Sequence, residues 1–443
     1  MKALGIDLGT TKVAVVLYDD RTGLEAVLSA AHDGAVQCDT PLAFEQDTVK
    51  ITECVLELLA QLPAVPRAAV AAVGVTGQMH SLLFRNGNAV SNLITWQDRR
   101  CGEEAVAEFN RRSGLKLCEG FGGTALARLA ASGELDPHAR AAALGDFLTA
   151  QITGNPTVIT DPTHAASWGI YDAGLGAWDL PALRKLGIPP EILPEIRPCG
   201  AVLGHVSAEY SRRSGLPVTA RVVNAIGDNQ ASILGTGEHF EREIYLTLGT
   251  GAQLSMVCRP MRRALSAKLE LRPFPGDRQL LVSAPLCGGA AFALLADTVN
   301  RFRAALGEAV LNRGELLDQL DRLGMEYLRI HGEPEIEIEP HFLGERHAPS
   351  LRGVIRGLTL DNVRPGALAA ALAFGIVRNL KADFPAGELA SRRVVIGSGN
   401  AVRLVKCIQY AIEKEFALPL KLSAGCEEAA VGAAKLALAA ADD

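Results

Sequence analysis

One carboxylate near the middle of the chain stands where it could act as a general base. Asp228 follows an apolar run over residues 221–226, which is typical of a strand, and precedes small residues over 231–235, which favour a helix. A carboxylate at such a strand-to-helix turn could accept the proton of a substrate hydroxyl. Aspartate is also a favoured cap at helix N-termini, so the pattern alone leaves both roles open. We expect Asp228 to lie exposed at this turn.

Three glycine-containing segments are candidates for binding phosphate. In Gly9-Thr10-Thr11-Lys12, small residues would let backbone N–H groups approach an anion and Lys12 could add a charge, while the preceding Asp7 could hold water around Mg²⁺. Gly249-Thr250-Gly251 repeats this pattern, and Gly397-Ser398-Gly399 precedes a predicted helix whose N-terminus would favour an anion. Each of the first two is also typical of a plain hairpin turn. No GxGxxG or GK[ST] pattern is completed after residue 399, which argues against dinucleotide-binding and P-loop enzymes.

Two further segments carry side chains suited to a polyol. Gln78-Met79-His80 follows a predicted buried strand, and Trp96 and Asp98 end the next predicted hairpin. Together they offer several hydrogen-bonding groups and one apolar wall. Each also has a structural interpretation: His80 as a satisfied structural histidine, Trp96 as a core aromatic, and Asp98 as the partner of Arg99 or Arg100 in an ion pair.

The elements that must position these residues repeat once along the chain. A length of 443 residues exceeds the roughly 250–300 that one core supports, so two domains are expected. The first half predicts strands at 2–8, 13–18, 24–30, 71–76 and 168–171, a hairpin over 81–95, and helices at 47–62, 124–133, 138–152 and 178–186. The second half predicts strands at 244–248, 253–258, 280–284 and 393–396, and helices at 290–306, 311–323, 365–380, 401–415 and 426–441. The strand–Gly-Thr–strand pattern thus begins both halves.

Composition narrows the class of protein. The apolar fraction is 48%, the charged fraction 21% and the net charge −6 without a basic run, which indicates a globular protein with no nucleic-acid partner. No apolar stretch reaches the roughly 18 residues of a membrane helix, and the first residues do not have the pattern of a secretory signal. The nine cysteines form no CxxC pair, so we expect reduced thiols in the cytoplasm rather than metal clusters or disulfides. Base rates favour a homodimer.

The motifs, taken in order, resemble the FGGY family of carbohydrate kinases over essentially the whole chain. The residues that carry the resemblance are Asp7-Leu8-Gly9-Thr10-Thr11-Lys12, Gly77-Gln78-Met79-His80, Trp96-Gln97-Asp98-Arg99-Arg100, Gly227-Asp228-Asn229-Gln230, Leu248-Gly249-Thr250-Gly251, Gly344-Glu345-Arg346 and Gly397-Ser398-Gly399. The resemblance implies an α/β protein with two ribonuclease-H-like domains of the actin/hexokinase/Hsp70 fold flanking a central cleft. Residues 1–229 would form the sugar-binding domain and residues 230–443 the ATP-binding domain.

The same resemblance implies a role for each candidate residue. Asp228 would be the catalytic base, and Asp7 would hold ATP-bound Mg²⁺ through water. The sugar would contact Gln78, Met79, His80, Trp96, Asp98 and Asn229. ATP would contact Gly9, Thr10, Thr11, Lys12, Gly249, Thr250, Gly251, Gly397, Ser398 and Gly399, with the last three beside the adenosine.

The substrate class follows from the resemblance as well. Met79-His80 stands where glycerol kinases have an Arg-Glu pair, and resembles the ketose kinases, namely xylulokinases and sedoheptulokinases. Residues 94–101 and 376–380 are most similar to sedoheptulokinases. The implied reaction is ATP-dependent phosphorylation of the terminal hydroxyl of a ketose, with sedoheptulose first and D-xylulose or another pentulose second. A non-catalytic sugar or ATP sensor of the same fold is a remote alternative, because Asp228 and both Gly-Thr turns are present.

Overall fold

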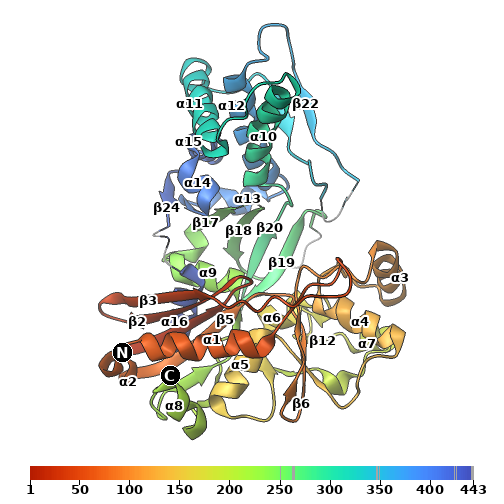
Figure 1. Ribbon diagram of the computed structural model, residues 1–443, viewed down its shortest axis with the longest axis vertical. Helices are drawn as coiled ribbons and strands as arrows, with labels where there is room; N and C mark the ends of the chain where they lie inside the picture. Colours follow the sequence, from red (N-terminus) through yellow and green to blue (C-terminus); the bar gives the residue numbers. More distant parts are fainter. Residues whose placement is uncertain are drawn as a thin grey trace. The chain divides into compact units, whose positions relative to one another are not determined.

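The computed structural model forms two compact units (Figure 1). It describes residues 1–249, 251–261, 265–345, 348, 350–423, 425 and 427–440, so Thr250 and Arg346 of the predicted motifs lie outside the described residues. The first unit comprises Met1–Thr236, Pro273–Asp277 and Cys426–Asp443, and the second comprises Gly237–Arg272 and Arg278–Gly425.

The first unit contains both strands and helices, in groups that follow one another along the chain. They are β1 (Lys2–Leu8), β2 (Lys12–Asp19), β3 (Gly23–Ala31), β4 (Glu45–Gln46), α1 (Thr48–Gln61), α2 (Ala64–Ala68), β5 (Val70–Gly77), β6 (Leu83–Asn86), β7 (Ala89–Val90), β8 (Leu93–Ile94), α3 (Glu103–Ser113), α4 (Gly122–Ser132), β9 (Arg140–Ala142), α5 (Leu144–Thr153), β10 (Ile159–Thr160), α6 (Pro162–Ser167), β11 (Tyr171–Asp172), β12 (Ala177–Trp178), α7 (Leu180–Leu186), a 3-10 turn (Pro190–Ile192), β13 (Glu195–Ile196), β14 (Val202–His205), α8 (Ala208–Ser214), β15 (Arg221–Val223), β16 (Ile226–Gly227), α9 (Asp228–Thr236) and α16 (Glu428–Ala439).

The main sheet of the first unit has the strand order β14-β15-β5-β1-β2-β3, with β16 also paired to β5. Strands β1, β2 and β3 form the predicted antiparallel meander, and β5 runs parallel to β1. Side chains alternate between the two faces of a strand, and both faces of β1 are buried. On one face Leu4 and Ile6 pack with Ile51 and Val55 of α1, and on the other Ala3 packs with α16.

The compact units of the structure differ from the predicted division at residues 229/230, because the C-terminal helix belongs to the first unit and the predicted division runs through α9. Helix α16 packs on β1, β5 and α9 of the first unit (Figure 1). A side chain on Gly5 would collide with the backbone of Ala430, so the helix approaches the sheet as closely as small residues allow. Alanines 430, 434 and 437 fill this contact. Chain order could not reveal this placement, because the helix returns to a sheet formed more than 400 residues earlier.

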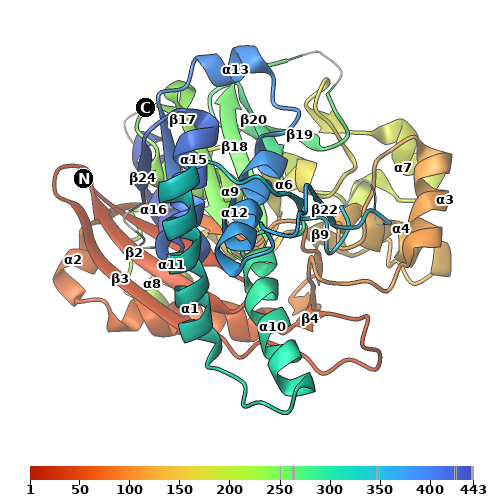
Figure 2. The same ribbon diagram turned by 90° about the horizontal axis from the view of Figure 1, so that it is seen from above.

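The second unit is built from another sheet and a group of long helices (Figure 2). Its elements are a 3-10 turn (Phe240–Arg242), β17 (Glu243–Leu248), β18 (Ala252–Cys258), β19 (Leu269–Phe274), β20 (Arg278–Ser283), α10 (Gly289–Ala305), α11 (Arg313–His331), β21 (Glu337–Glu339), β22 (Val354–Arg356), α12 (Pro365–Lys381), α13 (Ala386–Ala390), β23 (Val394–Ser398), α14 (Asn400–Leu404), α15 (Lys406–Phe416) and β24 (Leu420–Leu422). Helix α12 is buried along most of its length and packs against α11 and α15.

The second sheet repeats the topology of the first. Its order is β19-β20-β18-β17-β23-β24, with β17, β18 and β20 antiparallel and β23 and β24 parallel. Strands β17, β18 and β20 correspond to β1, β2 and β3, and β23 corresponds to β5. The repeated strand–Gly-Thr–strand pattern therefore reflects a repeated fold, in which each turn joins the first two strands of its sheet.

Several predicted elements have different bounds in the structure. The helix predicted at 138–152 is divided into β9 and α5, and residues 168–170 follow α6 rather than forming a strand. The hairpin predicted over 81–95 pairs at its tip, through β6 and β7, and at its base, where Leu82 bridges Ile94, while β8 also pairs with β4. The helix predicted at 401–415 is two helices, because Val405 has extended backbone angles. In each case hydrogen bonds to distant segments override a local apolar pattern.

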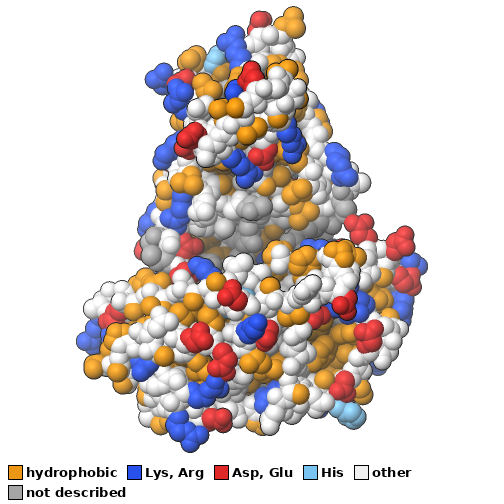
Figure 3. Space-filling model, in the orientation of Figure 1, with side chains coloured by type: hydrophobic (Ala, Val, Ile, Leu, Met, Phe, Trp, Pro, Cys, Tyr) orange, Lys and Arg blue, Asp and Glu red, His pale blue; other side chains and the backbone are white. Residues whose placement is uncertain are grey.

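The surface of the first unit carries charges of both signs. Figure 3 shows acidic and basic side chains interspersed over the face in view, in keeping with the absence of a basic run in the sequence. Within the described part of the chain, every helix is too short or too polar to cross a membrane.

Candidate active site

The Asp228 turn lies beside the end of the central strand of the first unit. Strand β16 runs parallel to β5, with Ile226 opposite Thr76 and Gly227 opposite Gly77. The Thr76 hydroxyl donates to the Ile226 carbonyl over 2.7 Å and fixes this register. Helix α9 begins at Asp228 itself, so the carboxylate emerges next to the segment that follows Gly77. Asp228 is half-buried rather than exposed as expected, and its Oδ1 accepts from the backbone N–H of Asn229 over 2.7 Å.

Asp7, Asp228 and Glu427 interact electrostatically, and Lys12 partly neutralises their negative charge. Burial, and to a lesser extent the charges of Asp228 and Glu427, raise the pKa of Asp7 to about 7, while Lys12 opposes the rise. Lys12 Nζ donates to Glu427 Oε1 over 2.5 Å. Glu427 was not a predicted site residue, and its contact with Lys12 depends on the return of α16 to the first unit. The arrangement leaves an excess of negative charge around Asp7.

This excess of charge fits a divalent cation brought in with phosphates. Asp7 Oδ1 is buried and has no hydrogen-bond partner among the described residues. No set of three or more His, Cys, Asp or Glu side chains in the described part of the chain is gathered closely enough to hold a metal alone. Mg²⁺ commonly keeps several waters and takes only one or two carboxylates, so a single orphaned carboxylate oxygen suits it.

The first Gly-Thr turn is fastened by side chains from three other segments. The Thr10 carbonyl accepts from Gln46 Nε2 over 2.7 Å and from His32 Nε2 over 3.1 Å. The Thr10 hydroxyl accepts from Trp96 Nε1 over 3.0 Å. Gly9 and Thr10 are half-buried in this arrangement, whereas Thr11 and Lys12 are exposed. Trp96 thus contacts the predicted phosphate turn, which its predicted place in the sugar pocket did not suggest.

Gln78 and Met79 connect the end of β5 to both of the predicted sites. Gln78 Nε2 donates to Gln46 Oε1 over 2.9 Å, so Gln46 joins Gln78 to the first Gly-Thr turn. A side chain on Gly227 would lie 2.9 Å from Met79 Sδ, so Met79 packs directly against the turn that carries Asp228. Both side chains are buried. The structure therefore brings Gln78, Met79 and Asp228 together within one unit.

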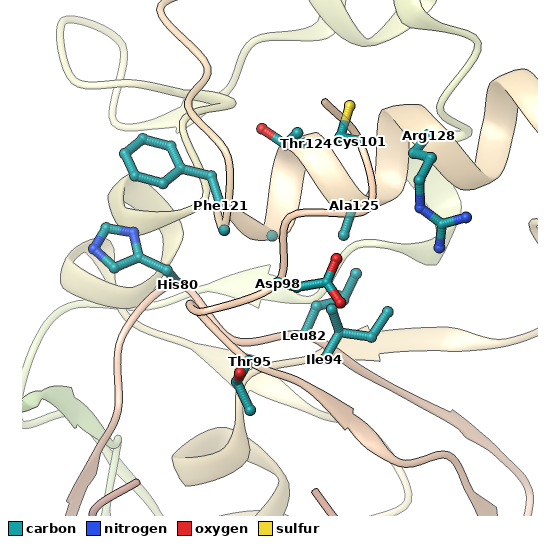
Figure 4. Close-up of a pocket in the computed structure, with 12 residues that line it drawn as sticks. His80, Leu82, Ile94, Thr95, Asp98, Cys101, Phe121, Thr124, Ala125 and Arg128 are labelled. Carbon is teal, nitrogen blue, oxygen red and sulfur yellow. The ribbon is translucent and has the colours of Figure 1, made fainter. Parts of the chain in front are cut away.

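His80 has a backbone conformation that non-glycine residues rarely adopt. Its φ is 68°, and it is held there by two bonds to Ser167, which accepts from His80 N at Oγ over 3.0 Å and from Nδ1 at the carbonyl over 2.6 Å. The ring stacks on Phe121 at a centroid distance of 4.6 Å (Figure 4). Strained residues fixed in this way are often found at functional sites, which fits a role for the remaining face of His80.

Asp98 lies in the same small pocket as His80 but has partners of its own. Its Oδ2 accepts from Arg100 Nε over 2.7 Å and from Phe44 N over 3.1 Å, so the ion pair with Arg100 is present. In Figure 4 the Asp98 carboxylate points away from the His80 ring. The pocket encloses only about 10 Å³, roughly enough for one water. As it stands, this pocket does not accommodate a sugar.

In the second unit, two glycine-containing segments meet at the end of the sheet. Thr247 lies opposite Ser398 in the parallel pair β17–β23, and their hydroxyls are 2.8 Å apart. Gly399 has a φ of 85°, and a side chain there would collide with the Leu248 carbonyl. The end of β17, just before Gly249, therefore lies against Ser398 and Gly399. Gly397 and Ser398 end strand β23 rather than forming a loop.

A third segment of this cluster was not predicted. Gly289 begins α10, and its N–H donates to the Gly249 carbonyl over 2.9 Å. Side chains on Gly288 and Gly289 would collide with the backbone of the Gly249–Gly251 turn. A 17-residue helix thus directs its N-terminus toward the turn, an arrangement that suits an anion. The Gly-Gly pair just before an apolar helical pattern was the available signal.

Comparisons with known proteins agree with this arrangement. The model of the FGGY family of carbohydrate kinases, N-terminal domain, matches residues 2–235. The chain is 30% identical to the sedoheptulokinase of Homo sapiens, covering 98% of this chain and 97% of that protein, and 29% identical to that of Mus musculus, with the same coverages. A crystal structure of a xyloylose kinase from Brucella ovis superposes with a TM-score of 0.84 at 22% identity, covering 100% of this chain and 91% of that one.

These findings define first a class and then a family. The repeated sheets and the superposition place the chain among proteins of the actin/hexokinase fold with two ribonuclease-H-like domains. The chain belongs to the FGGY family of carbohydrate kinases. It is therefore a sugar kinase, and the family implies that ATP is a substrate.

Proposed function

We propose that this enzyme transfers the γ-phosphoryl group of ATP to the terminal hydroxyl of a ketose, with sedoheptulose as the first choice. The observation that carries the proposal is the position of Asp228 beside Met79 and within the electrostatic reach of Asp7. A base, a polar segment suited to hydroxyls and a carboxylate suited to a metal thus belong to one unit. The similarity to sedoheptulokinases over nearly the whole chain supports the choice of sugar.

In the proposed reaction Asp228 acts as the base. The terminal hydroxyl oxygen forms a bond to the γ-phosphorus, the bond from that phosphorus to the ADP oxygen breaks, and the hydroxyl proton passes to the Asp228 carboxylate. Phosphoryl transfer has a loose transition state, so orientation of the hydroxyl matters more than a strong base. Gln78, Met79, His80, Trp96, Asp98 and Asn229 are proposed to surround the sugar. His80 and Asp98 would require the small pocket of Figure 4 to widen.

The phosphates of ATP are assigned to backbone-rich segments. We place them at Gly9, Thr10, Thr11 and Lys12 of the first unit and at Gly249, Thr250 and Gly251 of the second, with the adenosine beside Gly397, Ser398 and Gly399. Gly288 and Gly289 join the second group because they contact its turn. Mg²⁺ bound with ATP would neutralise charge on the phosphate oxygens, and Asp7 would hold it through water. We further propose a cytoplasmic enzyme that forms a homodimer and binds neither nucleic acid nor membranes.

The test compares acceptors and removes the base. ADP release from MgATP is measured with sedoheptulose, D-xylulose, D-ribulose, L-ribulose and glycerol, and the values of kcat/KM are compared. A site that bonds specific hydroxyls can reject an analogue lacking one by about 10⁴-fold, so a clear order is expected, with sedoheptulose first. A higher kcat/KM with a pentulose than with sedoheptulose would change the proposed acceptor and leave the proposed mechanism unchanged. Near-normal turnover by Asp228→Asn would overturn the assignment of the base.

A further inference from the structure

The short helix α6, residues Pro162–Ser167, is tied at its start to the turn that carries Asp228. The Thr163 hydroxyl accepts from the backbone N–H of Gly227 over 2.8 Å. The same hydroxyl donates to the carboxylate of Asp161, with Oδ1 at 2.7 Å and Oδ2 at 2.9 Å. Asp161 and Thr163 are fully buried. One threonine hydroxyl therefore joins a buried carboxylate to the residue just before the proposed base.

The Asp161 carboxylate is itself held firmly in place. It accepts from the His164 backbone N–H over 2.9 Å and from Cys199 Sγ over 2.8 Å, in addition to the Thr163 hydroxyl. The His164 imidazole lies beside it, with Nδ1 3.6 Å from Asp161 Oδ1 and 3.2 Å from Asp146 Oδ1. Burial alone lowers the pKa of His164, but Asp146, Asp161 and Asp228 outweigh it and raise the pKa to about 9. The His164 imidazole is therefore buried beside the carboxylates of Asp146 and Asp161, and the charge of the proposed base also raises its pKa.

The other end of α6 is tied to the proposed sugar-binding segment. Ser167 accepts both hydrogen bonds that hold His80 in its left-handed conformation, and its hydroxyl donates to the His164 carbonyl over 2.7 Å. The next residue, Trp168, donates from Nε1 to the Ser81 carbonyl over 3.1 Å. Helix α6 thus bonds at its start to the turn that carries the proposed base, and at its end to His80 of the proposed sugar site.

We propose that α6 is the positioning element of the acceptor site, with Thr163 orienting Asp228 through Gly227 and Ser167 orienting His80. This inference rests on the proposed function, since it assumes that Asp228 is the base and that His80 contacts the sugar. Neither Thr163 nor Ser167 touches the reacting atoms in this account. The two residues act on different steps, because one sets the direction of the base and the other sets the shape of the sugar site.

The experiment separates these two steps. Thr163→Val keeps the shape and removes the hydroxyl, and we expect kcat to fall about 10- to 100-fold with the KM for sugar unchanged. Thr163→Ser restores the hydroxyl and should restore kcat. Ser167→Ala removes one bond to His80 and should raise the KM for sugar about 5-fold with kcat unchanged. The matched control is Thr52→Val, a buried helical threonine whose hydroxyl bonds to Thr48 and Val49 of its own helix.

The possible outcomes distinguish the inference from the proposed function. If Asp228→Asn is inactive but Thr163→Val keeps kcat within about twofold of Thr52→Val, the positioning role is wrong and the base assignment stands. If Asp228→Asn stays active, the proposed function fails first. Equal losses in kcat and KM for both α6 variants, matched by lower thermal stability, would show a general structural role and also overturn the inference. If Thr163→Val does not fold, Ser167→Ala decides: an unchanged KM for sugar contradicts the proposal.

Discussion

The two units of this kinase share one topology and differ in what ends their strands. In the first unit Asp7 and Leu8 of β1 lie opposite Thr76 and Gly77 of β5. In the second unit Leu246 and Thr247 of β17 lie opposite Gly397 and Ser398 of β23. The first sheet carries the charged and amide side chains of Asp7, Gln78 and Asp228 at its strand ends, in addition to its Gly-Thr turn, whereas the corresponding strands of the second sheet end in glycines and small hydroxyl side chains.

The difference extends to how each end is held in place. The first Gly-Thr turn is fixed by side chains of His32, Gln46 and Trp96, whereas the second is packed against the backbone of Gly289 and lies next to Gly399. Side-chain networks can place functional groups around a small polar acceptor, and bare backbone can approach phosphates closely. Because the two units share one topology, the chemical difference between them comes from the residues at the ends of their strands.

The largest effect should come from removing Asp228, the proposed base in the first unit. Asp228→Asn keeps the size of the side chain and an oxygen that can accept from Asn229, so the fold should be unchanged. We expect kcat to fall about 10²- to 10⁴-fold, because the hydroxyl proton loses its acceptor. Steady-state kinetics with saturating sugar and ATP measures this, with the exposed Asp39→Asn as the matched control. If Asp228→Asn and Asp39→Asn were equally active, Asp228 would not be the base, and the proposed chemical difference between the two units would be contradicted.

The second unit should instead be sensitive to a single added methyl group. Gly399→Ala places a Cβ against the Leu248 carbonyl at a φ of 85°, so the end of β17 or the start of α14 must shift. We expect kcat/KM for ATP to fall about 100-fold, while binding of the sugar alone is unchanged. Gly387→Ala is the control in the same unit, because its Cβ would meet nothing. If Gly399→Ala weakened binding of the sugar and not of ATP, the proposal that the second unit binds ATP would be contradicted.

Local sequence patterns predicted the repeated part of this comparison. The strands around both Gly-Thr turns and the start of α9 at Asp228 follow from alternating apolar residues and small turn residues. The order of the motifs along the chain then indicated the family. These features depend on local sequence or on the order of motifs along the chain. They can therefore be identified without knowing which segments contact one another in the fold.

The sequence could not predict what depends on distant contacts. Glu427 reaches Lys12 only because α16 packs on the first sheet, and Gln46 reaches Thr10 and Gln78 across three separate segments. His164 was not singled out, because its significance comes from Asp146 and Asp161, whose burial beside it no periodicity reveals. The difference between the predicted division and the compact units, at α9 and α16, has the same cause.

The buried charges of the first unit should also make its stability depend on pH. The pKa of His164 is raised from 6.5 to about 9 in the folded protein, so the folded state binds the proton more tightly than the unfolded chain. Its contribution is therefore fully present below about pH 6.5 and is lost as the pH rises through about 9, and it amounts to at most roughly 3 kcal/mol. Urea unfolding of wild type and His164→Asn at pH 6 and pH 9.5 measures it as the change in their difference. Differences that stay constant with pH would mean that His164 is not charged in the folded protein.

The smallest effect should come from one hydrogen bond that links the proposed sugar wall to the first turn. Trp96→Phe keeps an aromatic ring and removes the Nε1–H that donates to the Thr10 hydroxyl. A hydrogen bond of this kind contributes about 1 kcal/mol, so kcat/KM should fall about 5-fold. Trp178→Phe is the matched control, because the Nε1 of Trp178 donates to the Pro194 carbonyl in the same unit.

The kinetic constant that changes shows what Trp96 does. If the KM for ATP rises, Trp96 acts mainly by holding the proposed phosphate turn; if the KM for sugar rises, its ring acts mainly as an apolar surface of the sugar site. An effect no larger than that of Trp178→Phe would show that the side-chain fastening of the first turn is dispensable, and the two units would then differ only in the residues that contact substrates.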